Sequence, residues 1–582
     1  MSERRSAANY QTWIIIGLAL LIVACLCVGV VVWAGDALFG ALPLPGRDEV
    51  KLPRSATADL TVAVSPGMAP TLNKLVETFN ARGLKTPDNT PMVVRTLTLV
   101  PEEMVAQSLG QPAFQALAPD SSLWLSQIDR QWAAAQGAAE GDESVIPIGY
   151  RRFSNPVRYA VSPVVIAAWE SVARELGWPE RAVGWQDIQN KATADPNFKW
   201  NHPSTGHASG LLATLAEFYA GAGLTRGLTP EAATAQATLD YVRAVEATVR
   251  FYGEGEDAIV SRLAGEGRGF LDAFVTQEQL VIHWNQTQSG ERLIALYPAE
   301  GTLWADHPLA LLELGAPGET PLSDNQRRTY RALADYLTSP EAQQALLAAG
   351  YRPADMTLQL DAGNSPFLQN DAVDWRQPQT TLQIPDDSVV AVVQNVWWYT
   401  KRPTNVFLVV DTSGSMQGNK IDLTKLALHA FIDQIRGDRD QLGLIAFSTG
   451  VSVLRSMQPL DEAGREDMHN AVNRMSAEGN TALIDGVWEA YRLLQAQGDT
   501  EAINAIVVMT DGQENNSAHR MSELKEQWGA AQGPSVVIFT IAFGSNADED
   551  VLRTMAEIGG GQYRRADETD IEELYKIIST YF

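Results

Sequence analysis

An apolar strand that ends in acidic and hydroxyl side chains constrains this 582-residue chain more than any other feature. Val406–Val410 is wholly apolar, which is typical of a strand buried on both faces of a parallel sheet. Asp411, Ser413 and Ser415 follow directly, so one carboxylate and two hydroxyls lie on the loop at the strand's carboxyl end. Ligands bind at that edge of open α/β sheets, and oxygen donors suit Mg²⁺. The stretch therefore predicts a doubly wound domain with a metal site.

Two later loops also carry an oxygen donor. Thr481 precedes a predicted helix over Leu483–Ala496, and Asp511 follows the apolar strand Ala505–Thr510. The rest of the predicted domain consists of strands at Leu442–Phe447, Val451–Leu454 and Val536–Phe543, with helices at Lys420–Ile435, Arg465–Met475 and Thr569–Ile578. The alternation of strands and helices predicts α/β architecture.

The D-x-S-x-S start at Asp411–Ser415, with Thr481 and Asp511 after it, resembles the metal-ion-dependent adhesion site of the von Willebrand factor A family. The resemblance covers residues 403–582 and implies a Rossmann-like fold. It implies that both serines, and either Thr481 or a water, ligate the ion directly, while Asp411 and Asp511 act partly through waters. The implied ion is Mg²⁺, with Ca²⁺ and Mn²⁺ as alternatives. In this family an Asp or Glu of a partner protein typically completes the coordination. The alternative is that D-T-S-G-S only caps a helix and turns a loop.

An uncharged stretch near the N-terminus predicts a membrane anchor. Trp13–Trp33 has 21 residues without a charge, enough to cross a bilayer as a helix, and a tryptophan stands at each end. We therefore expect a cytoplasmic tail at 1–12, a transmembrane helix at 13–34, a linker at 35–57, and a single-pass cell-membrane protein whose bulk is extracytoplasmic. A lipoprotein cleaved before Cys25 is the alternative, and the apolar run beyond Val28 favours the uncleaved anchor.

The middle of the chain also alternates strand-like and helix-like segments. It starts at Leu60–Val64, has further apolar runs at Leu280–Trp284 and Leu293–Tyr297, and carries a long helical pattern over Gln326–Ala349. We expect a mostly parallel sheet. The succession of LTVAVSPGMAP, YAVSPVVIA, WQDI, HPSTGHASG and DYLTSPEAQQALLAAGYRP resembles the type II periplasmic solute-binding proteins over about Ala58 to Pro353. The resemblance implies two α/β lobes over 58–377 that close on a ligand.

Candidate solute-binding residues share a position at strand ends or helix starts, where hydroxyls and unpaired N–H groups bind anions. They are Ser65, Ser121, Ser122, Ser162, Ser204, Thr205 and Ser209, with Trp284 as a stacking surface. They suggest a small polar or anionic solute. The alternative is that the hydroxyls are helix caps and turn residues and that the indole fills a lobe interior.

Several classes of function are disfavoured. The net charge of −26 argues against a nucleic-acid partner, and cysteines occur only at positions 25 and 27, so the bulk has no disulfide or thiolate metal site. No G-x-S-x-G or P-loop motif occurs, and we assign no catalytic residue and expect no enzyme.

The predicted function is membrane-anchored, divalent-metal-dependent binding of a protein or surface, combined with a solute-binding module. A junction at 378–402 separates the two domains, and its Trp397 and Trp398 are expected to pack against a neighbouring domain. The alternatives are a receptor for an ABC-type transporter with an ancillary metal domain, an assembly module inside the cell, and a solute-binding scaffold that serves as a spacer.

Overall fold

The computed structural model describes residues 58–137, 151–252, 255–316, 318–369, 371–530, 533–568, 571–579 and 582. The predicted tail 1–12, transmembrane helix 13–34 and linker 35–57 lie outside these residues. Within the described ranges, no helix is both long enough and apolar enough to cross a membrane.

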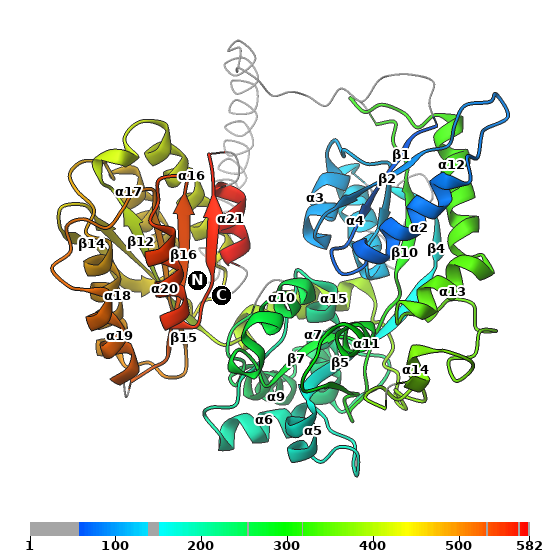
Figure 1. Cartoon of the computed structure of the whole chain (residues 1–582), viewed down its shortest axis with the longest axis horizontal. Helices are drawn as coiled ribbons and strands as arrows, with labels where there is room; N and C mark the ends of the chain where they lie inside the picture. Colours follow the sequence, from blue (N-terminus) through cyan, green and yellow to red (C-terminus); the bar gives the residue numbers. More distant parts are fainter. Residues whose placement is uncertain are drawn as a thin grey trace, which may run out of the picture. The chain divides into compact units, whose positions relative to one another are not determined.

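The first lobe is built on a five-stranded sheet in the order β2-β1-β3-β10-β4 (Figure 1). Strand β1 is parallel to β2 and β3, whereas β10 is antiparallel to both of its neighbours. The strands are β1 Leu60–Val64, β2 Val94–Thr98, β3 Ala116–Ala118, β4 Phe153–Arg158 and β10 Pro308–Leu312. The helices are α2 Ala69–Ala81, α3 Pro101–Leu109, α4 Ser122–Ala135, α12 Asp324–Leu337 and α13 Pro340–Ala348.

The second lobe has a six-stranded sheet with the path β11-β5-β7-β6, and β8 and β9 also pair with β5. Its strands are β5 Ala160–Trp169, β6 Trp200–Asn201, β7 Ala273–Gln277, β8 Leu293–Leu296, β9 Trp304–Ala305 and β11 Arg352–Pro353. Its helices are α5 Glu170–Leu176, α6 Trp185–Ala194, α7 Ala208–Ala222, α8 Pro230–Ala233, α9 Gln236–Glu246, α10 Glu256–Glu266, η2 Gly267–Gly269, α11 Glu278–Thr287 and α14 Pro366–Gln369.

Three predictions for this region were wrong in detail. Leu280–Trp284 is not strand-like but lies inside α11, because a short apolar run does not by itself distinguish a strand from a buried helix. The helical pattern over Gln326–Ala349 is two helices, since Ser339 caps a new helix that starts at Pro340. The sheets are mixed rather than mostly parallel, because β5 pairs antiparallel with four other strands.

The junction contains helix α15, Asp387–Thr400, which packs against α4, α7, α8 and α9. Trp397 is buried, packs edge-on against Tyr252 with ring centroids 5.1 Å apart, and donates a hydrogen bond from Nε1 to Glu246. The expectation that a junction tryptophan packs on a neighbouring domain is confirmed for Trp397.

The C-terminal domain is a six-stranded sheet in the order β14-β13-β12-β15-β16-β17, parallel except for the edge strand β14. Its strands are β12 Thr404–Asp411, β13 Gln441–Phe447, β14 Val451–Pro459, β15 Ile503–Thr510, β16 Val536–Phe543 and β17 Tyr563–Ala566. Its helices are η3 Gly414–Met416, α16 Asn419–Gln434, α17 Glu462–Asn473, α18 Leu483–Gln497, α19 Met521–Ala530, α20 Glu549–Gly559 and α21 Ile571–Ser579. The predicted doubly wound α/β sheet is confirmed.

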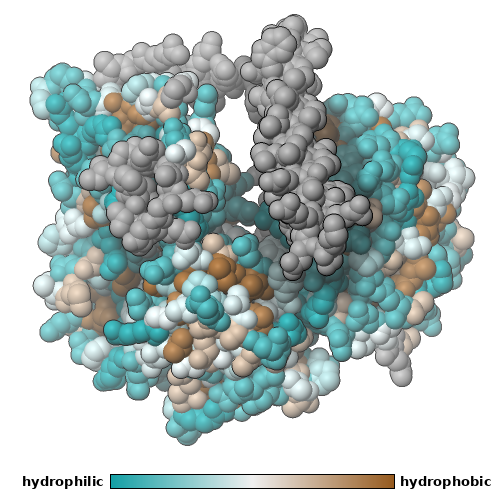
Figure 2. Space-filling model, turned by 180° about the vertical axis from the view of Figure 1, so that it is seen from behind, coloured by the Kyte–Doolittle hydropathy of each residue, from teal (hydrophilic) through white to brown (hydrophobic). Residues whose placement is uncertain are grey.

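Alternating side chains of β12 supply two separate cores. Val406, Leu408 and Val410 pack with residues of α16, α17 and α21, while Phe407 and Val409 pack with residues of α18, α19 and α20. A strand covered by helices on both faces must be apolar throughout, and this explains the uninterrupted run before Asp411. The surface seen in Figure 2 is mostly hydrophilic, with apolar residues in small groups.

Candidate functional site

Three loops at the carboxyl edge of the C-terminal sheet bring the predicted metal ligands into one region. Asp411 is the last residue of β12, and Ser413 and Ser415 lie in the turn that follows. Strands β12 and β15 pair in parallel with Val410 opposite Met509, so Asp511, which follows β15, lies at the same edge as Asp411. Thr481 precedes α18, the helix that packs under β12 and β15. The register of the parallel strands therefore determines where these side chains meet.

A chain of hydrogen bonds joins four of the five side chains. The Ser413 amide donates to Asp411 Oδ1 at 2.7 Å, and the Oγ atoms of Ser413 and Ser415 are 2.9 Å apart. Ser415 Oγ donates to Asp511 Oδ1 at 2.6 Å, and the Thr510 hydroxyl donates to Asp411 Oδ2. The carboxylates and hydroxyls thus lie close enough to share one ion.

Gly512 shows that Thr481 belongs to the same cluster. A Cβ atom placed on Gly512 would lie 3.3 Å from Thr481 Oγ1, 3.4 Å from Ser415 Oγ and 3.9 Å from Asp411 Oδ2. Oxygen atoms from the other two loops therefore surround this glycine, which belongs to the third. A side chain at position 512 would enter the space between them.

The cluster combines burial with excess negative charge. Asp411 and Asp511 are fully buried, and burial raises the pKa of the Asp411 carboxyl above its usual range. Lys420, from the first turn of α16, forms an ion pair with Asp511 Oδ2. Lys420 was not among the predicted site residues; its position at the start of the predicted helix at 420–435 places it near the Asp411–Ser415 loop but does not reveal its partner. Two carboxylates and one ammonium leave a negative charge, and the buried oxygens are ligand types that Mg²⁺, Mn²⁺ and Ca²⁺ accept.

Part of the predicted solute-binding set gathers around Asp120, at the carboxyl end of β3. Ser65 Oγ donates to Asp120 Oδ1 at 3.3 Å and accepts from the Asp120 amide at 3.2 Å. Ser121 caps α4 by accepting from the Leu123 amide, and the Ser122 amide donates to Asp306 Oδ1 at 2.7 Å. Several of these hydroxyls thus act as caps and turn partners, as the alternative interpretation expects.

The remaining hydroxyl residues belong to the second lobe. Ser162 Oγ bonds with Gln279, whose Nε2 donates to Tyr351 Oη, and that hydroxyl donates to the Gly67 carbonyl of the first lobe. Ser204 and Thr205 lie in the loop before α7, where a Cβ on Gly206 would be 3.1 Å from Glu102 Oε2 of the first lobe. Ser209 is buried in the first turn of α7.

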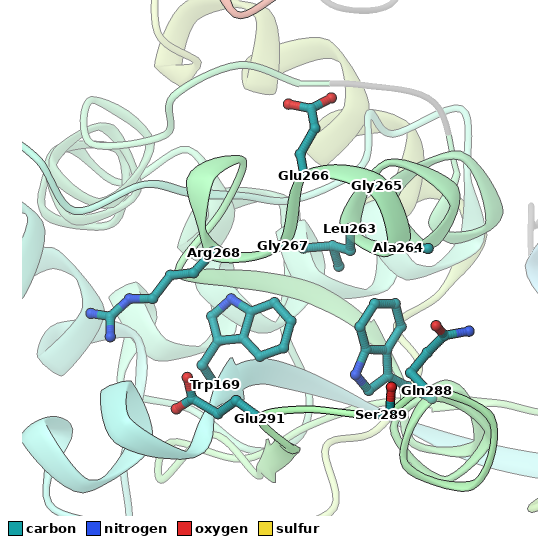
Figure 3. A pocket seen from close by; sticks show the side chains of 11 residues that line it. Trp169, Leu263, Ala264, Gly265, Glu266, Gly267, Arg268, Gln288, Ser289 and Glu291 are labelled. Carbon is teal, nitrogen blue, oxygen red and sulfur yellow. The ribbon is translucent and has the colours of Figure 1, made fainter.

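Trp284 lies apart from the hydroxyl residues. It packs edge-on against Trp169, which is seven residues along β5 from Ser162, roughly 23 Å of strand. The two indoles line a 410 Å³ pocket with Arg268 and Glu291, and Figure 3 shows Trp169 between these two charged residues. The structure does not bring Trp284 together with the serines.

Asp120 gives a pH-dependent prediction. Burial, with the nearby Glu256 carboxylate, raises its pKa to about 7 from 3.8. A raised carboxyl pKa stabilises the fold while the group is protonated, so this contribution is lost as pH rises from about 4 to about 7. We expect Asp120→Asn to match the parent near pH 4 and to exceed it in free energy of unfolding by about 2–4 kcal/mol at pH 8, in urea titrations. The exposed Asp361→Asn is the control, and parallel pH curves for parent and Asp120→Asn would contradict the assignment.

Two protein-family models match the chain, one over the two-lobed region and one over the C-terminal domain. Residues 60–352 match the bacterial extracellular solute-binding protein family, and residues 405–578 match the von Willebrand factor type A domain. The first match covers just over half of the chain, so the chain belongs to the bacterial extracellular solute-binding protein family and carries a von Willebrand factor type A domain in addition. This combination supports a binding or adhesion protein.

Individual relatives cover only parts of the chain. Inter-alpha-trypsin inhibitor heavy chain H3 of Mesocricetus auratus is 31% identical over 169 residues, which are 28% of this chain and 19% of the relative. Heavy chain H4 of Sus scrofa is 29% identical over 187 residues, 30% of this chain and 20% of the relative. The chain thus spans about a fifth of the length of these curated relatives. Among solved structures, the sulfate-binding protein SubI from Mycobacterium tuberculosis H37Rv is 17% identical with a TM-score of 0.36, covering 51% of this chain and 88% of its own.

Proposed function

We propose that this chain is a membrane-anchored extracytoplasmic binding protein whose von Willebrand factor A domain binds an acidic side chain of a partner through a divalent cation. The observation that carries the proposal is the cluster of buried oxygens from three loops, joined by hydrogen bonds between Asp411, Ser413, Ser415 and Asp511. Burying the Asp411 and Asp511 carboxylates without full charge compensation costs free energy, and a bound cation would supply the missing positive charge. The anchor would be the segment 13–34.

The residues of the site have distinct parts in this proposal. Ser413, Ser415 and Thr481 would offer hydroxyl oxygens, and Asp411 and Asp511 would provide the negative charge. Mg²⁺ prefers oxygen ligands and usually keeps some waters, so a partner carboxylate can replace one of them. Lys420 would leave Asp511 when the ion binds, because two cations repel each other near one carboxylate.

An open coordination position is testable without knowing the partner. We expect Mn²⁺ bound to the full chain to enhance water proton relaxation, and a short peptide with one glutamate to reduce this enhancement as its carboxylate replaces water. The same peptide with glutamine is the matched control. Loss of the signal in Ser413→Ala/Ser415→Ala would locate the ion. If Mn²⁺ binds at this site but the glutamate peptide leaves the relaxation enhancement unchanged, the adhesion proposal is contradicted.

Solute capture by the first domain is the second candidate function, with a transporter-receptor role as its extension. The observation that favours it is the set of polar groups around Asp120, where Ser65, Ser122 and Asp306 meet at the ends of first-lobe strands. Two carboxylates at this position favour a cationic or hydrogen-bond-donating solute over an anion, because like charges repel in a poorly hydrated site.

A further inference from the structure

Three buried side chains with metal-ligand chemistry meet in the second lobe, on elements that do not contribute to the von Willebrand factor A site. His202 follows β6, Glu217 lies in α7, and Glu246 is the last residue of α9. All three side chains have no exposed surface, and one ligand atom from each lies within 4.8 Å of the other two.

Glu217 is the member of this group that needs a ligand. Both of its carboxylate oxygens are buried, and neither has a hydrogen-bond partner in the part of the chain that the structure describes. Nor does any described Lys, Arg or His form an ion pair with it. Buried carboxylates in proteins are normally paired, hydrogen-bonded or coordinated to a metal. An unpartnered carboxylate that faces a histidine and a second carboxylate is therefore an observation that points to a cation.

The hydrogen bonds of His202 leave the correct nitrogen available for a metal. Nδ1 lies 2.7 Å from the Pro203 carbonyl oxygen, which can only accept, so Nδ1 carries a proton and donates it there. In the neutral ring Nε2 then has a lone pair, and it lies 3.3 Å from both carboxylate oxygens of Glu246. A proton on Nε2 makes this contact an imidazolium–carboxylate ion pair, and a metal ion bound between Nε2 and Glu246 would replace that proton. An Nδ1–H bonded to a backbone carbonyl is the arrangement that typically orients a metal-bound histidine.

Glu246 is held in place by two donors that leave further lone pairs available. Trp397 Nε1 donates to Oε1 at 2.7 Å, and Tyr252 Oη donates to Oε2 at 2.7 Å. The Tyr252 hydroxyl in turn accepts from the Arg402 amide at 2.8 Å. Trp397 belongs to α15 and Arg402 to the segment before β12. Each of the two carboxylate oxygens of Glu246 is therefore linked to the junction, one directly through Trp397 and one through Tyr252 and Arg402.

We propose that His202 Nε2 and the carboxylates of Glu217 and Glu246 bind one divalent cation, and that this ion holds helix α15 in place through Glu246 and Trp397. One imidazole and two carboxylates suit Zn²⁺, with Mn²⁺ as the closest alternative, and two carboxylates balance the charge of a divalent ion. The ion would be structural, since all three side chains are inaccessible to solvent. The proposal does not depend on the adhesion function of the other domain.

The test measures zinc in full chain that carries Asp411→Asn, so that the other metal site is weakened. After exposure to Zn²⁺ and gel filtration, we expect about one zinc per chain by elemental analysis, and below about a tenth of this in the Glu217→Gln variant. Asp240→Asn, an exposed carboxylate on the same helix as Glu246, is the matched control and is expected to keep the zinc. Equal zinc contents in Glu217→Gln and its parent would overturn the proposal, as would a parent that retains none.

Two further measurements keep the proposal testable if Glu217→Gln does not fold. Trp397→Phe removes the hydrogen bond to Glu246 while keeping an aromatic ring in the buried site, and we expect zinc affinity to fall about 10- to 100-fold. Zinc X-ray absorption of the parent is expected to show nitrogen and oxygen neighbours at about 2.0–2.2 Å. Unchanged affinity in Trp397→Phe, or an all-oxygen shell without the outer-shell scattering of an imidazole ring, would place the ion elsewhere and refute the site.

Discussion

Replacing Asp411 by asparagine is expected to weaken Mn²⁺ binding to the von Willebrand factor A domain by about 10²- to 10³-fold. Asparagine keeps one oxygen for the Ser413 amide, and its NH2 group can donate to the Thr510 hydroxyl oxygen, whose own proton also reaches the Gly512 carbonyl, so the loop should keep its conformation. The change removes one buried negative charge, and one unit charge about 4 Å away is worth about 4 kcal/mol at an effective dielectric constant of about 20. Calorimetric titration with Mn²⁺, in parent and variant, measures the difference.

A matched control separates the local site from general electrostatics. Asp422, in the first turn of α16, is exposed and contributes the same formal charge close to the loop. Asp422→Asn should change the Mn²⁺ affinity by less than about threefold, because water screens exposed charges. If Asp411→Asn and Asp422→Asn weaken Mn²⁺ binding equally, the ion binds the acidic surface in general and the loop cluster is not its site.

The core of the C-terminal domain was predictable because its strands have a simple signal. Val536–Phe543 and Ala505–Thr510 are apolar except for Thr540 and Thr510, as expected for strands covered on both faces, and the structure places β16 and β15 there. The strand ends then place their polar residues at one edge of the sheet. Asp411 ends β12 and Asp511 follows β15, its parallel neighbour, and the resemblance to the von Willebrand factor A family predicted that the two residues share one site.

Features that depend on contacts between distant segments were not predictable. The sequence does not show that Lys420 pairs with Asp511, which lies 91 positions away. Helix α15 carries a run of valines that favours a strand locally, yet packing against α7, α8 and α9 makes it helical. His202, Glu217 and Glu246 come from a loop and two helices, and their spacing matches no metal-binding motif. Only the fold brings them within ligand distance of one another.

Replacing Lys401 by methionine is expected to destabilise the von Willebrand factor A domain by about 3–5 kcal/mol, since it leaves a buried carboxylate without its cation. Lys401 and Asp440 are both 1% exposed, with Nζ 2.9 Å from Oδ1. Asp440 also accepts from the Thr404 amide at 2.9 Å and from the Gly437 amide at 3.0 Å. Lys401 Nζ donates further to the Phe582 carbonyl. One ion pair thus joins the junction, the start of β12 and the C-terminal residue 582.

A double variant distinguishes the effect of losing the ion pair from the effect of losing the packing of the Lys401 side chain. In Lys401→Met/Asp440→Asn the buried charge is gone while an oxygen for the Thr404 amide remains, so this double variant should be more stable than Lys401→Met alone. Arg492→Met breaks an exposed ion pair with Glu489 in the same domain and should cost less than about 1 kcal/mol. Hydrogen exchange of β12 and β15 in increasing guanidinium reports this domain separately from the rest of the chain. A double variant that is less stable than Lys401→Met would show that the carboxylate itself is favourable, through its backbone hydrogen bonds, and that Lys401 is not its necessary counter-ion.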